Sequence, residues 1–562
     1  MREHRETQKL FAQLSDEILR ALWTMNPVEA TILGAHHYDH TLGDMSESAI
    51  AGHAATLRGC LTRLQSEVDP SGLGPEEELD YHVAMSLASS NLIMLERQRP
   101  WMNNPSVYPS MCIWGCFSLL VRECADPDGN VHSMLSRIRE IPEFLEASKA
   151  NISDAVPLFV EHAREVIRGA CWFFGGPFAE IAARAGDFEG HLLSARDRAV
   201  AALQGYGEWL ADDVLPHADG DFAIGPDLYE QLLFAEHYLT YTPSDILQMA
   251  EEVLDDTEAK LREVAASIDP SITWRELVSR LKGDHPDADA LQETYRRGIQ
   301  SARDFVVERD LVTIPPDESL DVRDTPAFER MVTPYAAYMP PAAFGTRKSG
   351  IFWVTPINDN APKEQQLDQL RGHCIHATPV IALHEAYPGH HLQLCRALDG
   401  RSSLRKQMMS SLFVEGWALY CEEMMGEQGY YADPRIRLFQ LKDVLWRACR
   451  VMIDIGLHTR AMSFDDAVRM LVDSAKLEEV SAICEVKRYT MTPTQPMSYV
   501  VGKLLIMDLR DRMKRKLGGS FDLKSFHDEL LNHGSIPPAL LAAKMLSEPV
   551  RRTSAERLRR SA

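Results

Sequence analysis

Apolar residues recur at helical spacing through most of this chain. They stand three or four positions apart, so that one side of each segment is apolar, as in helices that pack against a core. Proline and glycine lie mainly between these segments, where helices are expected to end. The pattern therefore predicts a mainly α-helical protein, with helices over residues 5–25, 128–150, 243–266, 286–310, 404–426, 437–460 and 464–476.

Residues 312–360 interrupt the helical pattern. Prolines cluster there, and the run IFWV at residues 351–354 is aromatic and β-branched. This run lies between Gly350 and Pro356, which is typical of a strand. We therefore expect a small β-sheet just before the segment that contains His384.

The length of the chain allows a large core. A chain of 562 residues buries about three quarters of its unfolded surface. No Gly/Ser-rich, Pro-rich or low-complexity linker divides the sequence, and no repeat of fixed period is present. We expect one large helical domain over residues 1–562 with a deep central cleft. The alternative is two lobes, residues 1–310 and 311–562, of which the second carries the motifs described below.

The charge of the chain limits its partners. Acidic residues outnumber basic ones, 82 to 59, which gives a formal net charge of −23 at pH 7. Such a surface repels phosphate backbones and anionic lipids, so we expect no nucleic-acid partner and no membrane partner. The charge does not identify a substrate, nor does it decide between a monomer and a homodimer.

Two further observations concern location. The first residues, MREHRETQKL, are charged from the second position, and no run along the chain approaches the length of a membrane span. The ten cysteines are scattered and form no disulfide framework. From these observations we expect a cytoplasmic protein with reduced thiols.

The segment HEAYPGHH, residues 384–391, is the most informative part of the sequence. In the zinc-hydrolase motif H-E-x-x-H, two histidines four residues apart share one helix face and bind the metal, and the glutamate is the general base. Here the position four residues after His384 is occupied by Pro388. The segment therefore resembles a zinc site whose spacing has changed.

A straight helix would not bring these histidines together. His390 would point about 120° away from His384, and His391 would lie about 10.5 Å further along the helix axis. Pro388 has no N–H to donate to the preceding turn, and Gly389 relaxes the backbone, so we expect a bulge or kink. Such a break would return either His390 or His391 to His384. A purely structural role of the histidines is the alternative.

Glu415 is the candidate third ligand. It stands in the apolar run SLFVEGWALY, where an ionised carboxylate needs a partner such as a bound cation. With two histidines it would leave one position of a zinc ion open for water, and Glu385 could take the proton of that water. The alternative is a carboxylate exposed at a helix start. The later acidic residues of this segment are expected to be exposed in that way: Glu422, Glu423 and Glu427.

Further along the chain, Arg488, Tyr489 and Tyr499 stand near prolines. An arginine fork suits a carboxylate, and a tyrosine hydroxyl can donate to a developing oxyanion. Residues of these types near prolines are more often anchors of a loop. His458 is a similar case, either a histidine of the cleft or a contact at a helix end.

These motifs resemble those of the domain of unknown function 885 family. The resemblance extends over nearly the whole chain, and its most specific elements are HEAYPGHHLQ at residues 384–393 and EGWALY at residues 415–420. The supporting elements are PVEATILGAHHYD at 27–39, GTRKSGIFWV at 345–354, DIGLH at 454–458 and RYTMTPTQPMSYVVGK at 488–503.

At the level of fold, that family is similar to the carboxypeptidase Taq family of zinc carboxypeptidases, which use H-E-x-G-H and a later glutamate. The resemblance implies that His384, His390 and Glu415 bind the metal and that Glu385 is the base. The remaining assignments are catalytic roles at the oxyanion for Tyr499 and Tyr489, and substrate binding by Arg488, His458 and His391.

The sequence departs from the family patterns at two places. Residues 387–388 are an insertion relative to the carboxypeptidase motif, which leaves open whether His390 or His391 is the second ligand. Thr494 stands where glycine is common in the domain of unknown function 885 family, and Pro496 stands where alanine is common. The loop that contains them is therefore expected to be stiffer than in relatives.

The sequence thus predicts a zinc-dependent peptidase, a carboxypeptidase or dipeptidase acting on short peptides. One Zn²⁺ is expected, and Mn²⁺ or Co²⁺ would suit the same mixed ligands. Many zinc peptidases have a sheet beside the metal, where an edge strand can pair with an extended peptide. The alternatives are a metal-dependent hydrolase of a non-peptide amide or ester, and a non-catalytic helical binding protein in which the same residues form a buried polar network.

Overall fold

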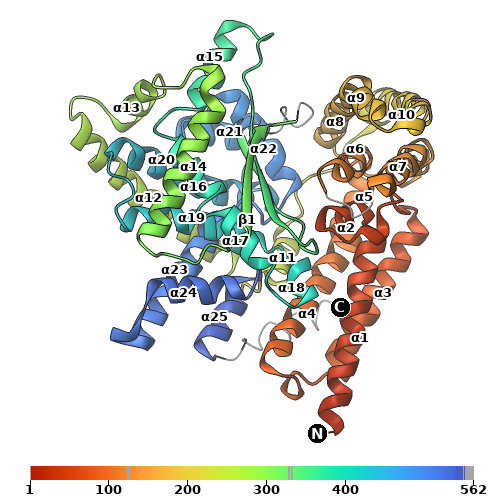
Figure 1. The fold of residues 1–562 in the computed structure, drawn as a ribbon, viewed down its shortest axis with the longest axis horizontal. Coiled ribbons are helices and arrows are strands. Elements are labelled where there is room, and N and C mark those ends of the chain that lie inside the picture. The colour runs from red at the N-terminus through yellow and green to blue at the C-terminus, as the bar shows by residue number, and fades with distance from the viewer. Residues whose placement is uncertain are drawn as a thin grey trace. The chain divides into compact units, whose positions relative to one another are not determined.

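The protein is mainly helical, with one small sheet (Figure 1). The structure is a computed structural model that describes residues 2–122, 127–326, 330, 333, 335–548 and 550. The predicted fold class is confirmed at this level, because helices follow one another along the chain and the strands lie between residues 318 and 354. The deep central cleft and the carboxypeptidase Taq-like arrangement stay predictions.

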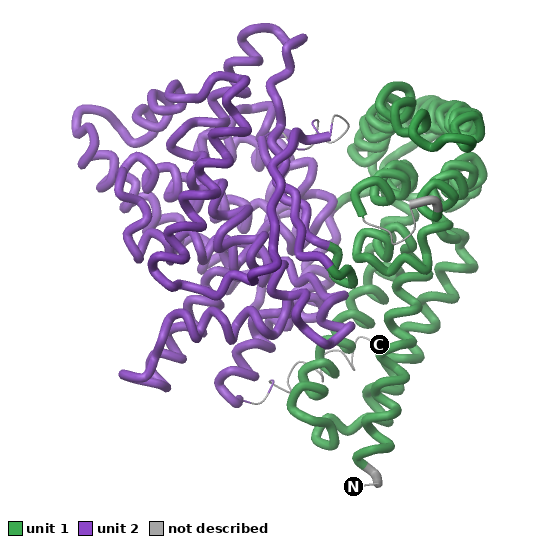
Figure 2. The backbone as a smooth tube through the Cα atoms, viewed as in Figure 1, with its two compact units in different colours: residues 1–222, 342–346 green, residues 223–341, 347–562 purple. Residues whose placement is uncertain are grey.

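The chain forms two compact units (Figure 2). Unit 1 contains Met1–Phe222 and Ala342–Thr346, and unit 2 contains Ala223–Pro341 and Arg347–Ala562. The boundary of the units therefore lies near residue 222, whereas the two-lobe alternative placed it at 310. Every motif residue from His384 onward belongs to unit 2. The prediction of a single domain is not decided by this division.

All regular elements of unit 1 are helices over its described residues. A buried arginine, Arg137, joins three of its segments, donating to the Pro27 carbonyl, the Thr31 hydroxyl and the Gly115 carbonyl at 3.2, 2.7 and 2.6 Å. The family-like segment at residues 27–39 therefore has a structural role here. The helices of unit 1 are α1 (Arg2–Met25), α2 (Pro27–Leu33), α3 (Glu47–Glu67), α4 (Pro75–Ile93), α5 (Pro100–Asn103), α6 (Val107–Val121), α7 (Pro127–Ser148), α8 (Pro157–Gly175), α9 (Pro177–Ala183) and α10 (Glu189–Trp209).

Unit 2 contains the sheet and the remaining helices. The strands are β1 (Glu318–Asp324), β2 (Ala336–Met339) and β3 (Lys348–Val354). The helices are α11 (Pro226–His237), α12 (Pro243–Ile268), α13 (Trp274–Leu281), α14 (Leu291–Glu308), α15 (Lys363–Gly372), α16 (Thr378–Glu385), α17 (His390–Ala397), α18 (Ser403–Gln407), α19 (Ser411–Glu427), α20 (Pro434–His458), α21 (Phe464–Asp473), α22 (Glu479–Met491), α23 (Ser498–Leu517), α24 (Leu523–Asn532) and α25 (Pro538–Leu546).

The sheet has the order β1-β3-β2 and lies against α17. β3 is central, parallel to β1 and antiparallel to β2, and it contains the predicted strand at residues 351–354. Its last three residues are buried, which agrees with the aromatic and β-branched composition of that run. The outer strands β1 and β2 each have one edge without a strand partner in the described part of the chain.

Side-chain caps determine where two long helices of unit 2 begin. α12 begins where the Thr242 hydroxyl accepts from the backbone N–H of Asp245 while the Asp245 carboxylate accepts from the Thr242 N–H, a capping box with Pro243 at the first position. α20 begins where the Asp433 side chain accepts from the N–H of Arg435. These two helices pack along each other and support the site region.

Helices α19 and α23 cross at a pair of glycines. A Cβ atom added to Gly416 would lie 2.5 Å from the Gly502 Cα, and one added to Gly502 would lie 1.9 Å from the Leu412 carbonyl oxygen. Both distances are far below van der Waals contact, so only glycine permits this approach. Since Glu415 precedes Gly416 and Tyr499 stands one turn before Gly502, the crossing brings these two side chains close together.

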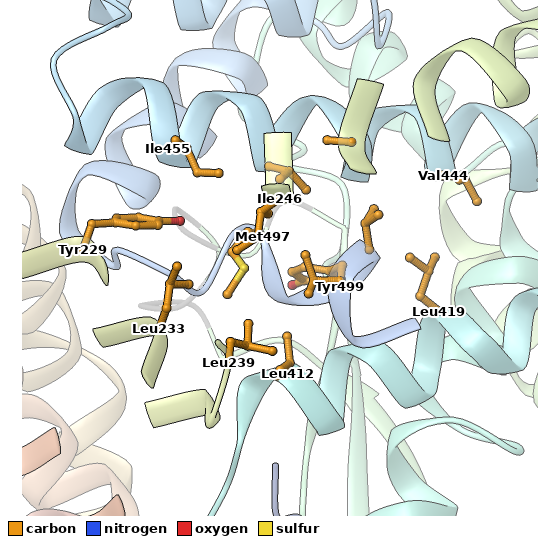
Figure 3. Close-up of a cluster of buried hydrophobic side chains, with 14 residues drawn as sticks. Tyr229, Leu233, Leu239, Ile246, Leu412, Leu419, Val444, Ile455, Met497 and Tyr499 are labelled. Atoms are coloured by element: carbon orange, nitrogen blue, oxygen red, sulfur yellow. The ribbon is translucent and has the colours of Figure 1, made fainter. Parts of the chain in front are cut away.

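A buried hydrophobic cluster includes residues of both crossing helices (Figure 3). Its members come from α11 and the segment after it, from α12, α19 and α20, and from residues 497–501 at the start of α23, so it packs α19 and α23 against α11, α12 and α20. The labelled residues in the close-up are Tyr229, Leu233, Leu239, Ile246, Leu412, Leu419, Val444, Ile455, Met497 and Tyr499.

Two expectations about membranes and thiols can be compared with the structure. Within the described residues, no helix combines the length and the apolar character that a membrane crossing requires. The nine cysteines in the described part of the chain are free thiols.

Candidate metal centre

The predicted break in the helix is present between α16 and α17. α16 ends at Glu385, and the backbone N–H of Gly389 donates to the Leu383 carbonyl at 3.1 Å before α17 begins at His390. A Cβ atom on Gly389 would lie 1.8 Å from the His384 carbonyl oxygen, so this position requires glycine. The segment is therefore not one straight helix, and the break that the spacing of the motif predicts is present.

The break brings His384 and His390 to the same carboxylate. Glu415 Oε2 lies 3.3 Å from His390 Nε2 and 3.8 Å from His384 Nε2, and the two imidazole rings are nearly perpendicular. One ligand atom from each residue lies within 4.8 Å of the others. Ligand atoms at about 2.0–2.1 Å from a tetrahedral zinc ion lie roughly 3.3–3.5 Å apart. The three side chains therefore fit one small cation with little movement.

His391 is directed to the sheet and does not join this cluster. Its Nδ1 lies 2.9 Å from the Tyr338 hydroxyl and its Nε2 lies 2.8 Å from Glu318 Oε2, and its side chain is fully buried. Tyr387 also donates to Glu318 Oε2, at 2.6 Å. Both ring nitrogens are thus occupied by β1 and β2. Of the two open alternatives for the second ligand, the geometry favours His390, and it leaves His391 no free nitrogen for a substrate.

Glu422 supports the first histidine. It lies about two turns after Glu415 on the same face of α19, and its Oε1 accepts a hydrogen bond from His384 Nδ1 at 2.8 Å. This bond fixes the His384 tautomer and leaves Nε2 facing the cluster, as carboxylates do for metal-binding histidines. By contrast, His390 Nδ1 is buried without a hydrogen-bond partner in the described residues.

The expectation that the later acidic residues of α19 are exposed is therefore wrong for two of them. The Glu422 side chain is fully buried. The Glu423 side chain is mostly buried and forms ion pairs with Arg437 and Lys503. Glu427 is the most exposed of the three and pairs with Arg510. The helical spacing of Glu415 and Glu422 was the available sequence signal, because both fall on one face of a helix that is otherwise apolar there.

Buried charges shift the pKa values of the cluster. Burial lowers the pKa of His384, but its hydrogen bonds with Glu415 and Glu422 outweigh this and raise the pKa to about 9. Burial raises the pKa of Glu415, but the two histidines outweigh it and hold the pKa well below its usual value. At neutral pH and without metal, a proton therefore occupies the histidine that a cation would use.

We expect the apparent affinity for Zn²⁺ to rise with pH. His384 must lose its proton before Nε2 binds a metal, and its pKa of about 9 keeps it protonated through the neutral range. The apparent Kd should therefore fall about tenfold per pH unit from roughly pH 6 to 8 and level off above about pH 9. Competition with a chromophoric chelator at a series of pH values measures this. A Kd that does not change with pH would contradict it.

Glu385, the predicted general base, is the last residue of α16. It is half-buried and close enough to His384 for its charge to contribute to the raised pKa of that histidine. Among the described residues its carboxylate has no hydrogen-bond partner within the protein. The position matches the glutamate that follows the first histidine in zinc-hydrolase helices.

Tyr499 lies beside the cluster, whereas Tyr489 does not. The Tyr499 ring is stacked on the His384 ring with a centroid distance of 6.5 Å, and burial together with the charge of Glu415 raises its pKa. Tyr489 is fully buried and donates to Glu485 Oε2 at 2.6 Å. The structure thus brings one of the two predicted tyrosines to the candidate site.

Arg488 and His458 also have partners within the protein. Arg488 donates to Glu485 at 2.9 Å and to the Gln495 side chain at 2.9 Å. His458 is fully buried, and its Nε2 donates to the Tyr489 carbonyl at 3.0 Å. Their predicted contacts with a substrate have no support in this geometry. Glu485, which stands three and four residues before Arg488 and Tyr489 on α22, was the sequence signal for these pairs.

The fold and the cluster define a class of protein: a mainly helical protein with a candidate centre of two histidines and one glutamate for a metal ion. The chain belongs to the family described as bacterial protein of unknown function, DUF885, whose profile matches residues 27–545. The family resemblance stated from the motifs is therefore confirmed. Among curated proteins, none matches this chain.

Two solved structures have the same fold. One is a candidate lipoprotein of unknown function from Shewanella oneidensis, with 27% sequence identity, a TM-score of 0.79, and coverage of 95% of this chain and 99% of that one. The other is a candidate lipoprotein from Colwellia psychrerythraea, with 18% identity, a TM-score of 0.80, and coverage of 97% and 99%. The second likeness, at this identity, shows the fold alone.

The description of the Shewanella oneidensis protein contradicts the predicted cytoplasmic location. That protein is described as a candidate lipoprotein, and lipoproteins are held at a membrane by attached lipid. The prediction depended on the charged first residues, the lack of a membrane span and the scattered cysteines, none of which identifies a lipoprotein. The predicted cytoplasmic location is therefore wrong.

Proposed function

We propose that this chain is a metal-dependent hydrolase, and more specifically a zinc peptidase that acts on short peptides. The observation that carries the proposal is the meeting of His384, His390 and Glu415 across a broken helix, with their ligand atoms within 4.8 Å. Two histidines and one carboxylate are the ligand set of catalytic zinc sites that keep a position open for water. Glu385 directly follows the first histidine, where a base is needed.

The chemistry follows from the neighbours of the cluster. A bound Zn²⁺ would supply a Lewis acid that polarises a carbonyl and lowers the pKa of water. Glu385 takes the proton of the attacking water and passes it to the leaving amine. Tyr499, whose ring lies beside that of His384, would donate to the developing oxyanion. Glu422 holds His384 in the required tautomer.

A peptide substrate is supported by the sheet beside α17. The outer strands β1 and β2 each have one edge without a strand partner in the described residues, and main-chain groups at such an edge can pair with an extended peptide. Tyr338 of β2 forms a hydrogen bond with His391 of α17, the helix that begins with the candidate ligand His390. A substrate at the β2 edge would therefore lie on the strand that contacts His391, the residue after the candidate ligand His390.

Two alternatives remain distinct from this proposal. The same cluster and base would hydrolyse a non-peptide amide or ester, because the chemistry at the carbonyl is shared. In the non-catalytic alternative, the histidines with Glu415 and Glu422 form a buried polar network that only stabilises the fold, and their mutual ion pairs are compatible with that role.

Metal analysis combined with a substrate panel tests the proposal. The protein is purified without added metal, its metal content is measured, and hydrolysis of short peptides and of simple amides and esters is followed before and after chelation. We expect one divalent ion per chain, and peptide hydrolysis that chelation abolishes and Zn²⁺ restores. His390→Ala should lose the ion, whereas His191→Ala, at an exposed position of α10, should keep it.

Each result separates the alternatives. Turnover of esters or amides without turnover of peptides would favour the non-peptide hydrolase. A chain that binds no divalent ion, and whose stability is unchanged in chelator, would overturn the enzyme proposal and favour the polar network.

A further inference from the structure

The second carboxylate oxygen of Glu415 contacts a residue that is not among the predicted site residues. Oε2 faces the histidines, and Oε1 accepts a hydrogen bond from the Gln495 side-chain amide at 3.4 Å. This contact is at the long end of hydrogen bonding. Gln495 lies in the short segment between α22 and α23, and its amide also contacts the Tyr499 hydroxyl.

We propose that Gln495 is a positioning residue that holds the Glu415 carboxylate so that only Oε2 faces the metal. The inference rests on the proposed metal function and adds a residue to it. A carboxylate with one oxygen held by an amide binds a cation through the other oxygen, which keeps the coordination number low. A low coordination number leaves the open position that a catalytic zinc site requires.

Arg488 sets the orientation of the Gln495 amide. A guanidinium has only donors and a carboxylate has only acceptors, so an amide between them can satisfy both in one orientation alone. Gln495 Oε1 accepts from Arg488 Nη1 at 2.9 Å, and Nε2 is thereby turned to Glu415. Arg488 is itself held by Glu485 at 2.9 Å. The arginine that was predicted to bind a substrate carboxylate thus orients this amide.

A buried aspartate holds the segment that carries Gln495. Asp454 on α20 is fully buried, and its two oxygens accept from the backbone N–H groups of Thr494 and Met497, each at 3.2 Å. Tyr229 donates to the same carboxylate at 3.0 Å. The backbone positions on both sides of Gln495 are therefore fixed from α20.

Thr494 adopts a left-handed backbone conformation, with φ of 71°. A β-branched residue rarely adopts this conformation, so it is held there by the surrounding contacts. The Thr494 hydroxyl lies 2.9 Å from Glu236 and 3.0 Å from His237, both of α11. These contacts hold the segment in one conformation.

Zinc titration of Gln495 variants tests the inference. The full-length metal-free chain is titrated with Zn²⁺ against a chromophoric chelator, and with Co²⁺ while the visible spectrum is recorded. Gln495→Ala removes the amide, and Gln495→Met removes it while keeping the side-chain volume. Gln248→Ala is the matched control, because this exposed glutamine on α12 also donates to a glutamate, Glu252, at 3.1 Å.

We expect both Gln495 variants to bind Zn²⁺ about 10- to 100-fold more weakly than the wild type, the range typical of groups that orient metal ligands. The Co²⁺ bands should weaken, because a released Glu415 can bind through both oxygens and raise the coordination number. The control should match the wild type in both measurements. Melting of the metal-free proteins checks the fold, and Gln495→Met decides the question if Gln495→Ala is unfolded.

The results distinguish this inference from the proposed function. A wild type that binds neither ion would overturn the metal function itself. A wild type that binds Zn²⁺, together with Gln495→Met of unchanged affinity and unchanged Co²⁺ spectrum, would overturn the positioning role alone.

Discussion

Replacing Glu385 by glutamine is expected to reduce the rate of peptide hydrolysis about 10²- to 10⁴-fold, the usual contribution of a general base. The amide has the size of the carboxylate but does not accept the proton of water. Since Glu385 is not one of the three clustered ligands, the variant should keep its metal. Metal content and kcat, measured on the same preparation, show both effects.

The control for this experiment is Glu364→Gln, at an exposed position of α15 that is outside the cluster. It should have wild-type activity and metal content. If Glu385→Gln retains activity, the mechanism with this base is wrong even if the metal is present. If it loses the metal as well as activity, Glu385 belongs to the ligand set and the base lies elsewhere.

Replacing Gly502 by alanine is expected to destabilise the protein by at least about 3 kcal/mol, the upper part of the range for overpacked cores. The new Cβ would lie 1.9 Å from the Leu412 carbonyl oxygen and 2.8 Å from the Gly416 Cα, so backbone rather than a flexible side chain blocks it. The better helix propensity of alanine returns only about 1 kcal/mol. Urea unfolding followed by circular dichroism measures the change.

Gly59→Ala provides the matched control. Gly59 is an exposed residue inside α3, and an added Cβ there meets no atom within 4 Å. This variant should be as stable as the wild type or slightly more stable. A Gly502→Ala variant with wild-type stability would show that α19 and α23 separate easily, and the close placement of Glu415 and Tyr499 would then lack its structural basis.

The parts of the site that the sequence predicted depend on local geometry. Pro388 and Gly389 made a straight helix impossible, and the structure has the break between Glu385 and His390. The strand at residues 351–354 was also a local inference, from composition and its flanking residues. In each case a few neighbouring residues determine the backbone.

The parts that the sequence did not predict depend on contacts between distant segments. Whether His390 or His391 faces His384 is decided by Glu318 and Tyr338, which hold His391 from the sheet. The spacing of the histidines along the chain does not predict these contacts with the sheet.

The partners of Arg488 and Tyr489 on α22 could in part be predicted from the sequence. Glu485 stands one turn before Arg488 and Tyr489, and a charge at that spacing competes for both side chains. The role of Gln495 was beyond local rules, because its partner Glu415 belongs to another helix.

The two candidate histidine ligands lie on separate helices, His384 on α16 and His390 on α17. This division affects the order in which the site forms. In an H-E-x-x-H protein one helix presents both histidines, so the spacing of the two ligands is set within a single helix. Here α16 and α17 have eight residues each, too few for a stable isolated helix, and only the folded unit 2 sets the distance between their histidines. A synthetic peptide of residues 378–397 should therefore be a poor chelator. If the chain binds the proposed ion, unit 2 has to fold before the site can form.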